Sequence, residues 1–170
     1  MGIEMKWSLV LGVSLALAAF VPAQSAPLDG AYRAGDYPRA IRKIGPAAER
    51  GNPRAQVFLG FMYQYGRGVP QNYALATYWY RRSAEQGNPT AQHLLGLMFD
   101  KGLGVPTNHV AAYVWLSLAA SRTKGPEHED NVRLRDAVAA KMSFGQLYDA
   151  QALAQTWAPK PEVVAVAPRP

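Results

Sequence analysis

A short segment ending in lysine comes nearest to a catalytic motif in this sequence. Residues Ser121-Arg122-Thr123-Lys124 fit the pattern S-x-x-K, in which a serine attacks an acyl group with the help of a nearby lysine. The companion patterns S-D-N and K-T-G are missing, and the segment follows a predicted helix. We therefore interpret it as a linker, and we predict no catalytic residue and no enzymatic activity.

The loop Gly66-Arg67-Gly68 has the composition of a phosphate-binding loop. Glycines allow backbone N–H groups to converge on an anion, and an arginine can neutralise the charge of that anion. The loop recurs 36 residues later as Gly102-Leu103-Gly104, without the arginine. The glycines have a structural reason to persist, because they can end a helix in the left-handed conformation and permit a tight return. We predict a bend between two helices at both places, and no bound cofactor.

Metal ligands are scarce in the sequence. There is no cysteine, which excludes thiolate sites and disulfides. The three histidines, His93, His109 and His128, belong to no H-E-x-x-H motif, and no two of them lie four residues apart. The sequence therefore predicts no metal site.

The central part of the chain repeats with a period of 36 residues, and this repeat indicates the elements that position these side chains. Asn52-Pro53 recurs as Asn88-Pro89, where the asparagines suit helix N-caps and the prolines suit the first helical position. Each unit is therefore predicted to be a helix, a loop and a second helix. The recurring signature positions are Leu59, Gly60, Gly66, Gly68 and Trp79 in one unit, and Leu95, Gly96, Gly102, Gly104 and Trp115 in the next.

A glycine lies in the middle of the first helix of both units, at Gly60 and Gly96. Such a glycine costs about 1 kcal/mol of helix stability relative to alanine. A cost that recurs implies a use that recurs. We predict that the two helices of each unit approach closely here, with a bulky Trp or Tyr of the partner helix filling the space.

The consensus of the two units, A-x-x-x-L-G-x-M-[YF]-x-x-G-x-G-V-P-x-N-x-x-x-A-x-x-W, resembles the Sel1-like repeat family, a branch of the tetratricopeptide-like α-solenoids. The resemblance is close from Asn52 to about Ser121 and looser from Leu28 to Gly51. It implies an all-α, right-handed solenoid of helical hairpins. It also implies a non-enzymatic scaffold for a protein or peptide partner, since members of this family act in envelope processes, signalling complexes and host interaction.

Further segments surround the two repeats. Residues 1–23 indicate a bacterial signal peptide, because Lys6 precedes an apolar run of 15 residues, which is short for a membrane span and is followed by small residues. We expect cleavage between residues 23 and 26, with an uncleaved anchor as the alternative. The mature chain is then expected to be periplasmic or secreted, and monomeric. The expected units are a partial unit (28–51), two repeats (52–87 and 88–123), a C-terminal helical hairpin cap (126–157) and a proline-rich disordered tail (158–170).

A groove is the expected binding surface, because the first helices of successive units usually line the concave side of a helical-repeat protein. We predict that the partner contacts side chains of these helices that lie off the recurring apolar stripe. They are Gln56, Phe61, Gln64, Gln92, His93, Leu97 and Asp100.

Charge and aromatic residues leave alternatives open. The segment from Pro27 to Thr90 holds nine basic residues and four acidic ones, so an anionic glycan is an alternative partner. An enzyme acting on cell-wall material is an alternative function. The net charge of +6 is too small to indicate nucleic acid. Helical spacing assigns Trp79 to the core, and Tyr78, Arg81 and Arg82 to the solvent.

Overall fold

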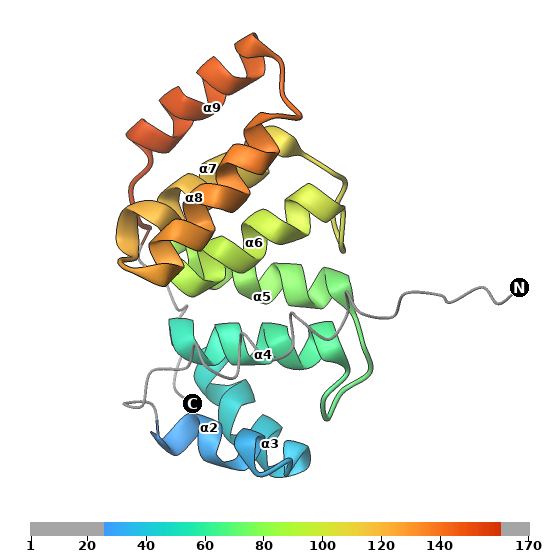
Figure 1. Ribbon diagram of the computed structural model, residues 1–170. Helices are drawn as coiled ribbons and strands as arrows, with labels where there is room; N and C mark the ends of the chain where they lie inside the picture. The colour runs from blue at the N-terminus through green and yellow to red at the C-terminus, as the bar shows by residue number, and fades with distance from the viewer. Residues whose placement is uncertain (1–25, 161–170) are drawn as a thin grey trace, which may run out of the picture.

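The computed structural model describes residues 26–160, so the predicted signal peptide and residues 161–170 lie outside the described residues. Within this range the chain forms eight helices and no strand, which confirms the expected all-α class. The helices stack in chain order from α2 and α3 at one end to α9 at the other (Figure 1). They are α2 (Ala26–Arg33), α3 (Tyr37–Glu49), α4 (Pro53–Tyr65), α5 (Tyr73–Glu85), α6 (Pro89–Lys101), α7 (His109–Arg122), α8 (Pro126–Ala139) and α9 (Phe144–Thr156).

Local signals set the bounds of the four central helices. At each start, an asparagine side chain accepts a hydrogen bond from the backbone N–H three residues later, at 2.9–3.0 Å. Helices α4 and α6 both end at a glycine in the left-handed conformation, Gly66 with φ 66° and Gly102 with φ 67°. These features confirm the predicted helix–loop–helix units. The capping residues are Asn52, Asn72, Asn88 and Asn108.

The mid-helix glycines are the points of closest approach within each unit. A methyl group at Gly60 would lie 2.6 Å from the Tyr80 ring of α5, and one at Gly96 would lie 2.8 Å from the Leu116 side chain of α7. The predicted close approach is confirmed in both units. A tyrosine fills the space in the first unit, as predicted, but a leucine fills it in the second, so the prediction of a Trp or Tyr is wrong there. Trp79 is only half-buried, beside the fully buried Tyr80.

Each bend also connects its unit to the unit before it. Gly68 lies against Tyr37 at the start of α3, and Gly104 lies against the backbone of Tyr73 at the start of α5. The hydroxyl of Thr77 on α5 donates a hydrogen bond to the carbonyl of Leu103 at 3.0 Å. The bends are therefore part of the interface between neighbouring units.

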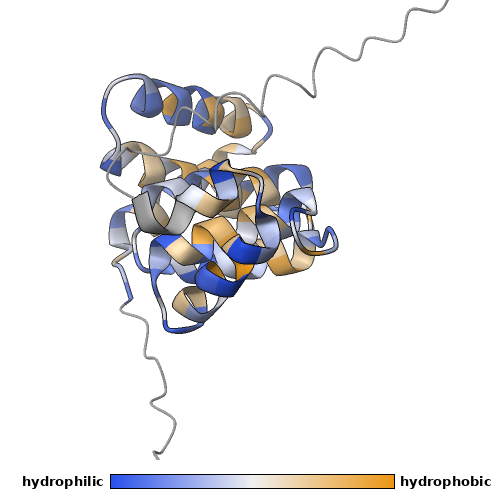
Figure 2. Cartoon of the chain, turned by 90° about the horizontal axis from the view of Figure 1, so that it is seen from below, coloured by the Kyte–Doolittle hydropathy of each residue, from blue (hydrophilic) through white to orange (hydrophobic). Residues whose placement is uncertain are grey.

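Apolar residues gather where helices face one another, and polar residues mark the loops (Figure 2). The core has two parts, one built from α3 and α4 and the other running from α5 to α9. Helices α8 and α9 both pack on α7, and a capping box between Ser143 and Gln146 starts α9, as predicted. None of the described helices is long and apolar enough to cross a membrane.

Residues 158–160 begin the segment that was expected to be disordered, and they return from α9 toward the end of α5. The Trp157 ring lies 5.9 Å from the Trp115 ring, with the Arg122 guanidinium 4.8 Å from it. The backbone N–H of Lys160 donates to the carbonyl of Glu85 at 2.8 Å. These contacts fix α9 and the four described residues after it, 157–160, to the repeats.

Candidate functional site

Two of the predicted groove residues, Gln56 and Gln92, are fully buried, so their prediction as surface residues is wrong. Each side chain donates a hydrogen bond from Nε2 to a carbonyl in the last turn of the preceding helix, Ala48 at 3.1 Å and Ala84 at 3.2 Å. Each of these carbonyls also accepts a backbone N–H, from Gly51 and Gly87 respectively, so the glutamine adds a second donor at the helix end. Both side chains are therefore structural.

Phe61, another predicted groove residue, is 8% exposed and lies in an aromatic cluster around Arg67. The Arg67 guanidinium lies 5.4 Å from the Tyr32 ring, 5.6 Å from Phe61 and 5.5 Å from Tyr65, and it also donates a hydrogen bond to the Tyr32 hydroxyl. Burial raises the pKa of Tyr32 to about 12 despite the nearby guanidinium. Arg67 therefore joins α2 to α4, and Phe61 is wrongly predicted as groove surface.

The other four predicted groove residues are half-buried. Gln64 accepts a hydrogen bond from the Tyr80 hydroxyl at 2.6 Å, and Asp100 pairs with Lys141 at 2.7 Å. Leu97 contributes an apolar side chain with no polar role. These positions do not converge on a common ligand site in the structure.

His93 is the fourth of these residues, and a polar network at the junction of α6, α7 and α8 holds it. Its Nδ1 lies 2.7 Å from Oδ1 of Asn131, while Nδ2 of Asn131 donates to Oγ1 of Thr123 at 3.2 Å. Because the Asn131 nitrogen is used on Thr123, its oxygen accepts and the His93 proton sits on Nδ1. Burial lowers the pKa of His93, against the opposing effects of Asn131 and Asp130.

We expect His93 to make the protein less stable in acid. The unfolded chain takes up a proton at this ring below about pH 6.5, whereas the folded protein resists protonation until its lower pKa is reached. The contribution of the neutral His93 side chain to the free energy of unfolding is thus fully present above pH 6.5, and it is lost as the pH falls through the pKa of His93 in the folded protein. Urea unfolding from pH 7.5 to 4.5 should show a smaller acid loss for His93→Gln. The exposed His128 provides the control, and a His128→Gln profile that matched His93→Gln would contradict this assignment.

The S-x-x-K segment has no geometry for acyl transfer. The Ser121 hydroxyl donates to the carbonyl of Leu118 at 2.8 Å and accepts a hydrogen bond from Arg122 at 3.2 Å. No hydrogen bond joins Ser121 to the exposed Lys124 in the described structure. A nucleophile needs a base within hydrogen-bond reach, which Ser121 lacks.

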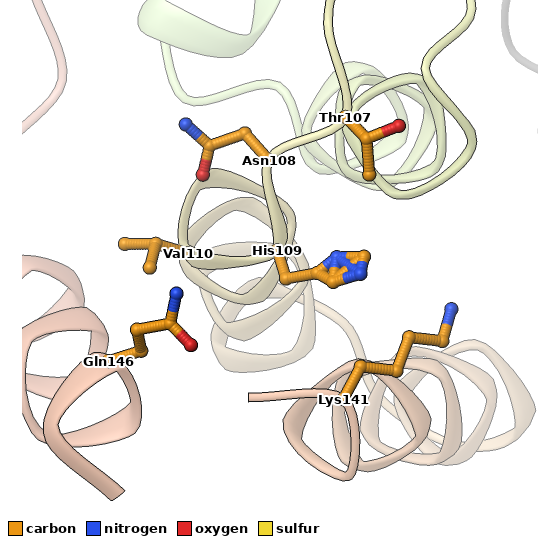
Figure 3. Close-up of a pocket in the computed structure, with 6 residues that line it drawn as sticks. All are labelled: Thr107, Asn108, His109, Val110, Lys141 and Gln146. Atoms are coloured by element: carbon orange, nitrogen blue, oxygen red, sulfur yellow. The ribbon is translucent and has the colours of Figure 1, made fainter. Parts of the chain in front are cut away.

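A cavity of about 490 Å³ opens between the start of α7, the end of α8 and the start of α9. Three of its polar side chains have structural roles: Asn108 caps α7, Gln146 completes the capping box of α9 and Lys141 pairs with Asp100, whereas Nδ1 of His109 is buried without a hydrogen-bond partner. In Figure 3, His109 points toward the side where Lys141 lies, and Val110 toward Gln146. Among residues 26–160 no group of three acidic or histidine side chains could hold a metal ion. The lining residues are Thr107, Asn108, His109, Val110, Lys141 and Gln146.

Exposed large apolar side chains occur on two helices, and they mark the candidate interaction surface. On α5, Tyr78 is 50% exposed, as predicted. The repeat pattern gave these residues no role, because it emphasises positions that are identical in both units. The exposed residues are Tyr73, Leu75 and Tyr78 on α5, and Phe144, Tyr148 and Leu153 on α9.

Comparisons with known proteins agree with this architecture. A family model described as Sel1 repeat matches residues 53–88 and 89–123. A crystal structure of a Sel1 repeat protein from Oxalobacter formigenes is 42% identical, with a TM-score of 0.53, over 58% of this chain and 72% of that one. A protective antigen present in uropathogenic Escherichia coli strains, which displays an SLR fold, is 30% identical with a TM-score of 0.64, over 70% of this chain. The chain spans only 25% of that antigen. No curated protein matches the sequence.

Proposed function

This chain belongs to the Sel1 repeat family, and from that premise we propose that it is a non-enzymatic scaffold that binds a protein partner in the bacterial envelope. Stacked helical hairpins present an extended surface, and such surfaces are suited to binding other proteins. The observation that carries the proposal is the exposure of large apolar side chains on α5 and α9, while the side chains of His93 and Ser121 are engaged in hydrogen bonds inside the chain.

The proposed binding surface differs from the groove that the sequence suggested. Three of the seven predicted residues are buried, and three others are held by partners within the chain. Exposed aromatic side chains are enriched at interfaces, because they supply a large apolar area at a low cost in side-chain entropy. We therefore place the interaction on the exposed side chains of α5 and α9.

The envelope location is supported by the sequence before the repeats. The apolar run from Trp7 to Val21, with Lys6 before it and small residues after it, has the features of a signal peptide. Neither alternative function gains a specific observation: the Ser121 hydroxyl donates to the Leu118 carbonyl, and the guanidinium groups of Arg67, Arg81 and Arg82 lie over aromatic rings of the chain itself.

Photo-crosslinking in intact cells tests the scaffold function. A photoreactive phenylalanine would replace one exposed residue at a time, and a scaffold should give discrete adducts with another protein at some of the positions. Mass spectrometry of the same material should show a mature chain that starts at Gln24, which is cleavage after Ala23. A protein that formed no adduct at any position would contradict the scaffold function, and an intact N-terminus would contradict the cleavage of the signal peptide. The positions are Arg54, Tyr78, Lys101 and Tyr148.

A further inference from the structure

We propose that the outer face of α5 is a docking site for an acidic amphipathic helix of a partner protein, an inference that rests on the scaffold function. This α5 face consists of Leu75, Tyr78, Trp79 and Arg82. Their spacing of three, one and three residues places them on one side of the helix, away from the buried Ala76. Leu75 is 39% exposed and Tyr78 is 50% exposed, so the face presents a large apolar area to solvent.

Contacts within the chain hold the α5 face in one conformation. The rings of Tyr78 and Trp79 lie edge to face at 5.1 Å. The Arg82 guanidinium lies 4.9 Å from the Trp79 ring and 5.7 Å from the Tyr78 ring, and it donates to the carbonyl of Glu49 at 3.4 Å. Because these side chains are already ordered before binding, little side-chain entropy is lost when a partner binds them.

The same face one repeat later is covered by the chain itself. The equivalent positions on α7 are Ala111, Val114, Trp115 and Leu118, where Leu118 is 4% exposed and the other three pack half-buried against the core. The added element there is α9, which packs on α7, and the ring of Trp157, directly after α9, lies edge to face with the Trp115 ring. In the described structure α5 packs chiefly on α4 and α6, and no third helix packs on it as α9 packs on α7. The α5 face therefore continues a surface on which a helix already sits.

Helix α9 indicates the chemistry of the helix that would fit. It turns Leu147 and the fully buried Ala150 toward the core, and Trp157 follows on the same side. A small residue between larger apolar ones lets two helices approach closely. A partner helix for α5 should thus carry an apolar stripe with a small residue near its middle.

The positive charge of the surface around α5 favours an acidic partner helix over a basic one with the same apolar stripe. From Tyr37 to Glu85, which spans α3 to α5, the chain holds eight basic residues and two acidic ones, Glu49 and Glu85. Arg81 is exposed on α5, beside the α5 face. Opposite charges at the rim of an interface favour association and reject basic partners.

A peptide with the sequence of α9 and its flanking residues provides the probe. Fluorescein-labelled peptide of residues 143–157, carrying Gln151→Glu and Gln155→Glu, is titrated with the full-length protein and followed by anisotropy. We expect saturable binding that Tyr78→Glu and Leu75→Glu each weaken at least tenfold. Ala137→Glu is the control, because Ala137 is an exposed apolar residue on α8, outside the α5 face and outside α9, and it should change the affinity less than twofold. The same peptide with lysine at both positions should bind at least tenfold more weakly.

Three outcomes would overturn the proposal. The first is that the peptide does not bind the wild-type protein. The second is that both α5 variants retain binding while circular dichroism shows them folded. The third is that the wild-type protein binds no peptide but sediments with phosphatidylglycerol vesicles, while Tyr78→Glu does not sediment; the face would then be a membrane contact.

The two proposals fail in different ways. Crosslinked protein adducts in cells from Lys101 or Tyr148, without adducts from Tyr78, would leave the scaffold function standing and remove the α5 site. Absence of adducts at every position would contradict the scaffold function itself, whatever the peptide does.

Discussion

Replacing Tyr80 by alanine is expected to lower the free energy of unfolding by about 3–5 kcal/mol, as loss of a buried aromatic ring does. Tyr80 is fully buried on α5, and its ring fills the space that Gly60 leaves on α4. Without the ring, the two helices of the first repeat face a cavity at their closest point. The side chain of Gln64 also loses the hydroxyl that donates to it at 2.6 Å. Urea unfolding followed by circular dichroism measures the change.

Two further substitutions separate the causes. Tyr80→Phe keeps the ring and removes the hydroxyl, so it should cost about 1–2 kcal/mol, the usual range for an unmet polar group. Tyr78→Ala removes an exposed tyrosine of the same helix and should change stability by less than about 0.5 kcal/mol. If Tyr80→Ala were as stable as Tyr78→Ala, the assignment of Tyr80 as the side chain opposite Gly60 would be wrong.

The sequence predicts the repeating hairpins well because their determinants are local. Asn52 and Asn88 satisfy backbone groups within one turn, and Gly66 and Gly102 supply a backbone conformation that other residues adopt with strain. Such requirements act over a few residues, so they leave a mark in the sequence wherever the structure repeats.

The candidate surface is harder to predict, and Gln56 with Gln92 shows why. Both are predicted as groove residues, yet they recur at the 36-residue period. A polar residue that recurs with the core is expected to satisfy a recurring backbone group, and both bond to a helix-end carbonyl. That recurrence is the available signal for a structural role.

His93 and Asp100 fail as groove residues for a different reason. Neither recurs, since Val57 and Gln64 occupy the equivalent positions, and their partners Asn131 and Lys141 lie beyond the repeats. Contacts between a repeat and an irregular C-terminal pair of helices follow no period. The open α5 face depends on the same irregularity, because α9 packs on α7 and no described helix packs on α5 in the same way.

Replacing Gly104 by alanine is expected to destabilise the interface between neighbouring units. A methyl group at this position would lie 2.3 Å from the backbone of Tyr73, and Gly104 has a φ of 71°. The clash is with backbone, so the bend must move away from α5 and weaken the contact between Thr77 and Leu103. Overpacking and left-handed strain together predict a loss of roughly 2–5 kcal/mol.

The control for Gly104→Ala is Gly66→Ala, which imposes the left-handed strain without the clash. Gly66 has a φ of 66°, and the nearest atom to an added methyl group would be 3.4 Å away. It should therefore cost only roughly 1–2 kcal/mol. Equal losses of unfolding free energy for the two variants would show that the bend does not bear on the preceding unit. If the contact of Gly104 with Tyr73 matters, Gly104→Ala must lose more unfolding free energy than Gly66→Ala. The two glycines have similar left-handed φ values, and they differ in the atoms that an added methyl group would meet.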